Sequence, residues 1–533
     1  MVEILIVIGA AIIIGNTIAE KFKLIAPLVL IAVGALVSFI PHLPPITVDP
    51  HLVLSVFLPL LLYWEALNIS LRGIKRTFRG IMLNGTLMVI FVAVSVGLVG
   101  HLVGLTLGAA LLIGAAVGPT DATAVAALGK GISPRQMIVL RAESLINDGT
   151  ALVVFALALE YATDEVKITA THAIGSFLLS FVGGAVVGLA VGWVIARIGR
   201  FVESYMIASA FRMVTPFIAF FLAEEIEASG VLAVVVTGLY MAQVGPKFVS
   251  MQSRFLARPV WGVASYILNS LLFLLVGLYL PATVRGLNSD SLTHALLATV
   301  AIYCAMMLAR WIFGETIIRL IRMLDRRPSQ KLRRTTVFER LVSTVAGFRG
   351  AISLAVVFSI PETLANGEPF PYRDQIIFVT SGVVILSLLV QGLLLPKVVE
   401  LTQKNPNPLE AQRSQADAEE FKEAVRTTAE RVLEDLPQLV EELDVPQGPA
   451  DRVRGEWERK LTIATSWQAG NEENERAAEV SAENALRLRV IQSARQHIID
   501  LRDAGRIDDE VLIAMMDRYD IEEMRLVGPI EME

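Results

Sequence analysis

The sequence predicts an all-α membrane protein that ends in a soluble helical tail. Of its 533 residues, 54% are hydrophobic and only 18% are charged. Residues 1–400 contain long apolar runs, and several exceed the roughly 20 residues that cross a bilayer core. Residues 401–533 are instead dense in Glu, Asp, Arg and Lys. We therefore expect a transmembrane domain over 1–400 and a helical tail over 401–533.

The apolar runs predict about thirteen transmembrane helices. The first run follows Met1 and lacks the basic start and the cleavage site of a signal peptide, so we interpret it as a span. The single cysteine, Cys304, lies inside a later run and excludes a disulfide framework within one chain. The expected spans are residues 2–19, 24–40, 51–69, 80–103, 106–129, 136–160, 172–198, 204–224, 229–244, 260–281, 292–318, 336–360 and 374–396.

The charge of the loops predicts an orientation, because cytoplasmic loops carry an excess of Lys and Arg. One alternate set of loops holds only Lys167, Arg285 and Arg373. The opposite set holds Lys21, Lys23, Arg72, Lys75, Arg76, Arg79, Lys130, Arg135, Arg197, Arg200, Lys247, Arg254, Arg258, Arg319, Arg322, Arg326, Arg327, Lys331, Arg333 and Arg334. The N-terminus is therefore expected outside the cell and the tail in the cytoplasm.

The tail is expected to form amphipathic helices over residues 410–444 and 479–526. Leu, Ile and Val recur there at helical spacing among many charges. A solvated appendage is the simplest interpretation, and a regulatory or dimer-stabilising role is the alternative. No nucleotide or metal motif in the tail indicates a specific ligand.

The fifth span is interrupted about halfway by Gly118 and Pro119, which precede Thr120 and Asp121. Proline removes one backbone donor and clashes with the preceding turn. Unwound backbone at membrane depth must line a cavity or be buried in protein. Freed carbonyls and the Thr120 and Asp121 oxygens would then offer a cation site. The alternative is a simple proline kink, with Asp121 satisfied by a helix N-terminus.

The sixth span carries two carboxylates, an amide and a hydroxyl on adjoining strips of one helical face. Glu143 and Asn147 stand four residues apart, and so do Ser144 and Asp148. Ionisable groups inside a bilayer are costly and usually functional. The alternative is that Arg141 and Glu143 lie at the cytoplasmic interface and only Asp148 is deep.

Three further spans carry charged residues. Glu65 in the third span lies about two turns from a cationic loop, so an interfacial position is its alternative. Arg310 and Arg349, in the eleventh and twelfth spans, always carry charge and need acceptors. Gly347 and Gly350 weaken the helix around Arg349, which predicts a second interrupted helix. The first six and the last six spans would then form inverted repeats whose broken helices cross at the site.

Several other functions are not expected. The sequence contains no Ser-His-Asp set, phosphate-binding loop or metal-ligand run, so we expect neither an enzyme nor a bound cofactor. Nothing in the sequence indicates nucleic-acid binding. The glycine-rich run 182–188 predicts close packing between helices.

Taken together, three motifs resemble the monovalent cation–proton antiporter family. They are the Thr120-Asp121 pair in a broken span, the run from Glu143 and Ser144 to Asn147 and Asp148, and the run from Phe348, Arg349 and Gly350 to Ser353. The most similar branch is the bacterial sodium/proton antiporters related to animal sodium/proton exchangers, and the resemblance covers about residues 1–400. One departure is Ala122, which follows the Thr-Asp pair where family members often have proline.

The resemblance implies a role for each of these residues. The cation or proton site would comprise Asp148, Asp121, Thr120, Ser144 and Glu65. The scaffold would comprise Asn147 in contact with Arg349, and Glu143 paired with Arg310. Members of the family typically form homodimers, and the branch implies a multi-pass protein of the bacterial inner membrane. A mobile core domain would move like an elevator.

These residues predict an exchange of sodium or lithium for protons. Asp148 can hold a proton or a cation but not both comfortably, and hard oxygen ligands suit Na⁺ or Li⁺. Electrogenic relatives typically carry a second Asp where Asn147 stands, so the resemblance implies electroneutral exchange. K⁺ is the alternative substrate. A cation-binding membrane sensor or a cation-coupled symporter is the alternative class.

Overall fold

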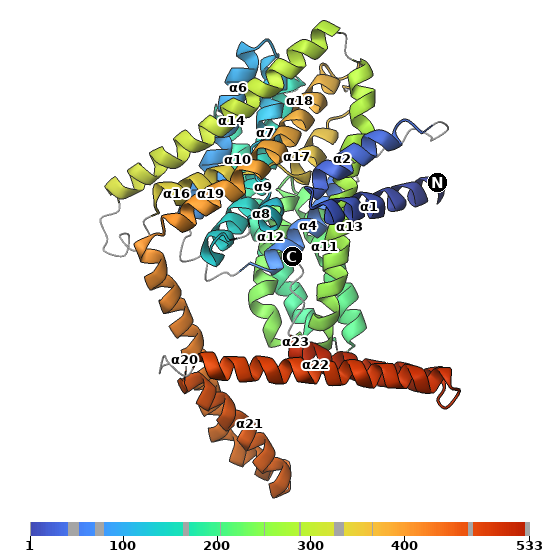
Figure 1. The fold of residues 1–533 in the computed structure, drawn as a ribbon. Helices are drawn as coiled ribbons and strands as arrows, with labels where there is room; N and C mark the ends of the chain where they lie inside the picture. Colours follow the sequence, from blue (N-terminus) through green and yellow to red (C-terminus); the bar gives the residue numbers. More distant parts are fainter. Residues whose placement is uncertain are drawn as a thin grey trace. The chain divides into compact units, whose positions relative to one another are not determined.

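The computed structural model describes residues 2–40, 53–69, 79–129, 131–163, 170–202, 204–249, 251–286, 289–324, 335–364, 366–466 and 473–527 (Figure 1). Several of the loop cations used to predict the orientation lie outside these residues. They are Arg72, Lys75, Arg76, Lys130, Lys167, Arg326, Arg327, Lys331, Arg333 and Arg334. The orientation therefore stays a prediction.

The chain divides into two compact units, Met1–Asn405 and Pro406–Glu533. The helices of the first unit are α1 (Val2–Phe22), α2 (Ala26–Val37), α4 (Leu58–Leu67), α6 (Val89–Leu102), α7 (Leu107–Ala116), α8 (Ala122–Leu128), α9 (Pro134–Ala162), α10 (Ala170–Gly199), α11 (Tyr205–Glu224), α12 (Gly230–Val244), α13 (Met251–Gly286), α14 (Ser289–Leu324), α16 (Val337–Val345), α17 (Ala351–Phe358), α18 (Arg373–Leu386) and α19 (Gly392–Lys404). Three π-helical segments join them, η1 (Val53–Phe57), η2 (Leu83–Met88) and η4 (Ser387–Gln391), together with the 3₁₀ turn η3 (Gly245–Lys247).

The described residues form an all-helical membrane protein, as predicted. Nine of their helices are long and apolar enough to cross a membrane, and three shorter apolar helices accompany them. Every expected span falls on a helix or on consecutive helical segments. The count of thirteen crossings in two inverted repeats stays a prediction.

Two of the expected spans are interrupted. The first consists of α7 and α8, which are separated by the non-helical residues 117–121. Gly118 and Pro119 lie in this gap, where the sequence predicted it. The second consists of α16 and α17, which are separated by residues 346–350. These two gaps, called the first break and the second break below, carry the polar residues of the site.

Small residues let helix backbones approach closely within the first unit. On α10, Gly184 and Gly188 face the carbonyl oxygens of Ser229 and Ala233, so near that an added Cβ would have to displace them. This close approach of α10 and α12 confirms the packing predicted for residues 182–188.

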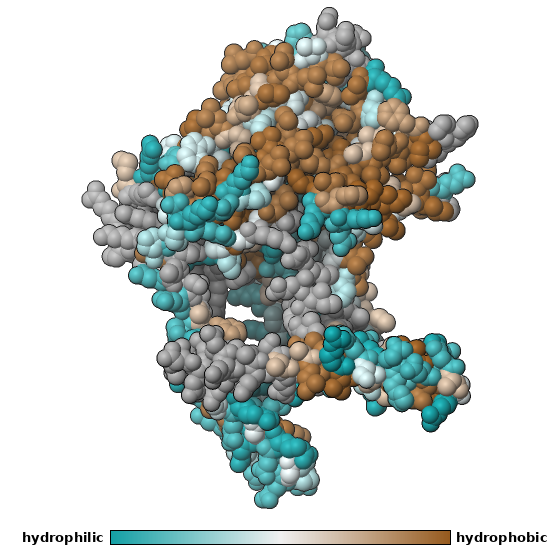
Figure 2. Space-filling model, in the orientation of Figure 1, coloured by the Kyte–Doolittle hydropathy of each residue, from teal (hydrophilic) through white to brown (hydrophobic). Residues whose placement is uncertain are grey.

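Apolar side chains cover broad areas of the surface of the first unit (Figure 2). Examples that are at least half exposed are Leu98, Leu178, Leu189, Trp193 and Leu297. Soluble monomers rarely expose apolar surface on this scale, whereas a bilayer solvates it.

The second unit is helical throughout its described residues. It comprises α20 (Pro408–Glu442), α21 (Gln447–Ser466), α22 (Glu473–Asp503) and α23 (Asp509–Val527). Helix α20 packs against α21, and α22 packs against α23. Arg495 on α22 forms ion pairs with Asp520 and Glu523 on α23. The expected amphipathic segments correspond to α20 and to the α22–α23 pair.

Candidate functional site

The first break ends at Asp121, which caps the start of α8. Its Oδ1 accepts hydrogen bonds from the backbone N–H groups of Thr123 at 2.8 Å and Ala124 at 3.4 Å, and from the Thr123 hydroxyl. Such donors and the helix dipole stabilise a carboxylate there. The second oxygen, Oδ2, faces Gly350, where an added Cβ would clash with it. Asp121 therefore caps a helix with one oxygen and faces the second break with the other.

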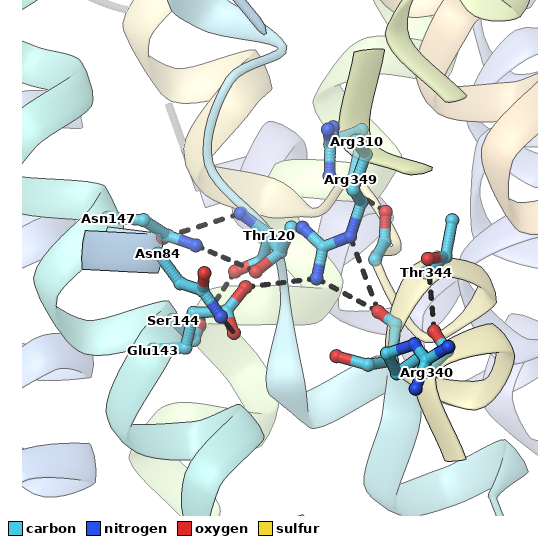
Figure 3. A network of polar contacts seen from close by, with 11 residues as sticks. Asn84, Thr120, Glu143, Ser144, Asn147, Arg310, Arg340, Thr344 and Arg349 are labelled. Carbon is cyan, nitrogen blue, oxygen red and sulfur yellow. Dashed lines mark hydrogen bonds and ion pairs between the residues drawn. The ribbon is translucent and has the colours of Figure 1, made fainter. Parts of the chain in front are cut away.

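Two side chains of α9 hold the first break at Thr120 (Figure 3). The Ser144 hydroxyl donates to the Thr120 carbonyl oxygen at 2.6 Å. The Asn147 amide donates to Thr120 Oγ1 at 2.7 Å, and its oxygen accepts from the Thr120 N–H at 3.4 Å. The break leaves these backbone groups without helical partners, and α9 supplies the replacements. We call Ser144 and Asn147 the first clamp.

Asp148 follows the first clamp on α9 and is only 1% exposed. Within the part of the chain that the structure describes, neither of its carboxylate oxygens has a hydrogen-bond partner. Its charged neighbours are the carboxylates of Asp121 and of Glu65, a partly buried residue of α4. A buried carboxylate without a donor is strongly unfavourable unless a proton or a cation neutralises it. We call these three carboxylates the acidic centre below.

Glu143 and Arg310 form a buried ion pair next to this centre. Arg310 Nη2 lies 3.0 Å from Glu143 Oε1, and both side chains are less than 5% exposed. The Asn84 amide of η2 donates to the other Glu143 oxygen at 3.3 Å. Arg310 also donates to the carbonyl oxygen of Ser343 on α16, at 3.0 Å. Glu143 is only 1% exposed whereas Arg141 is exposed, so the structure separates the two residues that the alternative placed together.

Arg349 in the second break does not bond with Asn147, and this corrects the expected contact. Its Nη1 donates to the Gly347 carbonyl oxygen at 2.8 Å, and its Nε lies 3.1 Å from Met306 Sδ. The Asn147 amide is instead engaged by Thr120. The physical reason is local, since each break frees backbone groups that lie nearer than the opposite side chain.

The two breaks touch through their backbones. The Asp121 N–H donates to the Phe348 carbonyl oxygen at 2.8 Å. Together with the contact between Asp121 and Gly350, this bond brings the first and second breaks together. The sequence-predicted residues of both breaks and of α9 therefore belong to one polar cluster inside the apolar core.

Two polar residues of the cluster were not predicted from the sequence. Asn84 supports Glu143, and Ser387 in η4 accepts a hydrogen bond from the Arg349 N–H at 2.9 Å. Both are neutral, and a neutral polar residue is a weaker signal in an apolar run than a charged one. The available signal was a polar side chain within an otherwise apolar run.

The polar atoms around the first break are mostly oxygens. Among the described residues, no three His, Cys, Asp or Glu side chains lie close enough together to hold a metal ion. Carboxylate, hydroxyl and carbonyl oxygens dominate the cluster, and oxygen is the ligand that hard cations prefer.

Comparisons with known proteins show the family to which the chain belongs. The family described as sodium/hydrogen exchanger, transmembrane, matches residues 7–401. The chain is 33% identical over 534 residues to the uncharacterized Na⁺/H⁺ exchanger Rv2287 of Mycobacterium tuberculosis, which covers 99% of this chain and 97% of that protein. It is 28% identical over 428 residues to the sodium, potassium, lithium and rubidium/H⁺ antiporter of Bacillus pumilus, covering 77% of this chain and 63% of that protein.

The fold is also known from a solved structure. It resembles the sodium proton antiporter MjNhaP1 from Methanocaldococcus jannaschii, with a TM-score of 0.59 and 16% identity, over 74% of this chain and 96% of that chain. The family match and the similarity to the mycobacterial protein along almost the whole chain confirm the resemblance drawn from the motifs. The chain belongs to the sodium/hydrogen exchanger family, and it is a multi-pass membrane transporter, not an enzyme, that exchanges cations for protons.

Proposed function

We propose that the chain exchanges sodium, or lithium, for protons at a site centred on Asp148. The observation that carries the proposal is the burial of both Asp148 oxygens without a hydrogen-bond partner in the described part of the chain. A carboxylate in that position must be neutralised, and a proton and a cation are mutually exclusive ways to do so. Competition between them at one carboxylate is the basis of exchange.

The cation ligands in this proposal come from both sides of the first break. Asp148 and Asp121 supply charge, and Thr120 and Ser144 supply neutral oxygens. The hydroxyl proton of Ser144 is used on Thr120, so its lone pairs remain available to a cation. Glu65 supplies a further carboxyl group that acts on Asp148. The ion pair of Glu143 and Arg310, with Asn147 and Arg349, forms the scaffold around these ligands.

The exchange is proposed to be electroneutral, one proton for one cation. Asn147 stands beside Asp148 and carries no ionisable group. Its amide spans the N–H and the hydroxyl of Thr120, so it acts as a structural link and not as a second proton carrier. A single titrating carboxylate then moves one charge in each direction.

The remaining features of the proposal follow the family. The transporter works by alternating access as a homodimer in the bacterial inner membrane, with the N-terminus outside and the tail in the cytoplasm. The contact between the breaks supports movement of the site as one body, because a backbone hydrogen bond and not only side chains joins them.

Potassium is the second candidate substrate. The Bacillus pumilus relative is named for sodium, potassium, lithium and rubidium, and it shares 28% identity with this chain. The ligand oxygens of Asp121, Asp148, Thr120 and Ser144 are equally compatible with K⁺, since cavity size and not ligand type separates the alkali ions.

Cation-driven proton flux in proteoliposomes tests the proposal. Wild type is compared with Asp148→Asn and with a control, Asp500→Asn, which removes a carboxylate from the tail. We expect Na⁺- and Li⁺-driven proton movement in wild type and control and none in Asp148→Asn. Equal flux in Asp148→Asn would overturn the site. Preference for K⁺ would select the second candidate, and a rate that follows a clamped membrane potential would contradict electroneutrality.

A further inference from the structure

The π-helical segment η4 interrupts the last span between α18 and α19. Both of its polar residues, Ser387 and Gln391, are fully buried. A π segment inserts one extra residue into a helix and frequently occurs at functional sites. Neither residue is charged, and neither belongs to the acidic centre described above.

These two residues form a chain of hydrogen bonds that ends at the second break. Gln391 Nε2 donates to Met307 Sδ at 2.8 Å, which leaves the amide oxygen as an acceptor. The Ser387 hydroxyl donates to that oxygen at 3.2 Å. Because the Ser387 hydroxyl proton points to Gln391, the lone pairs of Ser387 Oγ are free to accept a hydrogen bond. Ser387 Oγ accepts one from the Arg349 N–H at 2.9 Å.

The Arg349 N–H needs this acceptor because it lies between α16 and α17. A backbone N–H outside a helix and away from water is unfavourable unless another group pairs with it. Arg349 is itself fully buried. Ser387 therefore determines where the backbone of the second break lies.

The other side of the same backbone segment contacts Asp121. The Phe348 carbonyl oxygen accepts from the Asp121 N–H, and Gly350 touches the Asp121 carboxylate. Three consecutive residues thus connect Ser387 to a proposed cation ligand. A shift of Arg349 would move its neighbours on both sides and, with them, the position of Asp121 Oδ2.

We infer that Ser387 and Gln391 are positioning residues for the cation site, acting through the second break on Asp121. We call them the second clamp, because they hold the second break as Ser144 and Asn147 hold the first. This inference rests on the proposed role of Asp121 as a cation ligand. Ser387 does not touch the cation, so its loss weakens cation binding without removing the carboxylate that takes the proton.

The test measures the KM and kcat of Na⁺-driven proton flux in proteoliposomes for full-length variants. We expect Ser387→Ala to raise the KM for Na⁺ about five- to tenfold, as loss of one buried hydrogen bond would, with kcat within about twofold of wild type. Ser387→Thr keeps the hydroxyl and should restore most of the affinity. Gln391→Met frees the hydroxyl to turn away and should raise KM by about two- to threefold.

The matched control is Thr380→Val on α18, in the same span. Thr380 is fully buried, and its hydroxyl has no hydrogen-bond partner among the described residues. We expect its KM to match wild type. An unchanged KM in Ser387→Ala, or an equal rise of KM in Thr380→Val, would overturn the inference. Neither outcome affects the proposed function, which depends on Na⁺-driven flux in wild type. If Ser387→Ala does not fold, the KM of Gln391→Met decides in the same way.

Discussion

The first and second breaks use one design for opposite charges. In the first, Asp121 lies at the start of α8 and accepts hydrogen bonds from backbone N–H groups. In the second, Arg349 lies beyond the end of α16 and donates to the Gly347 carbonyl oxygen. Backbone N–H groups at the start of a helix stabilise an anion, and a carbonyl oxygen freed in a break stabilises a cation. An interrupted helix can therefore stabilise either charge, depending on which backbone groups it frees.

The two clamps differ in a way that the helix geometry explains. Ser144 and Asn147 stand three residues apart on the regular helix α9, and each bonds directly to Thr120. Ser387 and Gln391 stand four apart within η4, and only Ser387 reaches the backbone of the second break. The first clamp thus forms three hydrogen bonds with its break, and the second clamp forms one. The second break should be the more easily displaced.

The largest effect on the apparent Na⁺ affinity should come from closing the space between the breaks. Gly350→Ala would place a methyl group against the Asp121 carboxylate, and overpacking of this kind typically costs about 1–3 kcal/mol. We expect the apparent Na⁺ affinity to fall about tenfold or more. The control is Gly314→Ala on α14, where an added Cβ meets no atom within 4 Å. Equal affinities in both variants, measured by Na⁺-driven flux, would show that the breaks do not press on each other.

The largest effect on stability is expected from the ion pair that connects the two regions. Arg310 bonds both Glu143 on α9 and Ser343 on α16. Arg310→Met leaves Glu143 charged and buried, which should destabilise the protein by about 3–5 kcal/mol. Adding Glu143→Gln removes the unpaired charge and should recover part of the loss. Thermal unfolding in detergent measures both variants, and a double variant no more stable than the single one would contradict this account.

The smallest effect should come from the support that Asn84 gives to Glu143. Asn84→Ala removes one 3.3 Å hydrogen bond to Glu143 and should reduce the free energy of unfolding by about 1 kcal/mol. Asn84→Asp places a like charge beside Glu143 and should be worse. If both variants unfold like wild type, η2 plays no part in holding the site, and only the second break depends on a π segment.

Much of the fold could be predicted because a helix that crosses a bilayer needs about 20 predominantly apolar residues. Apolar runs identified the helices, and Gly118 with Pro119 located the first break, since proline cannot continue a helix. Charged residues inside those runs identified Asp121, Asp148, Glu143 and Arg349. A charge within an apolar run is costly at membrane depth, so these residues stand out in the sequence.

The pairings inside the cluster could not be predicted in the same way. Asn147 has several polar groups within reach of its helix, and only the course of the first break selects Thr120 as its partner. Ser387 and Asn84 are neutral and common, and the π segments that orient them leave little trace in the apolar pattern. Which side chains contact each other depends on backbone irregularities such as the single extra residue of a π segment. The spacing of apolar residues in the sequence does not reveal such an insertion.

The length of α13 and α14 has a consequence for the lipid around the protein. Each contains 36 residues and would extend about 54 Å, whereas a hydrocarbon core is about 30 Å thick. Such helices must tilt or project beyond the acyl chains, and adjusting to membrane thickness carries a modest energetic penalty. The tilt of α13 and α14 should therefore depend on the acyl-chain length of the surrounding phospholipids. Bilayer thickness is thus a property of the membrane that can influence this transporter.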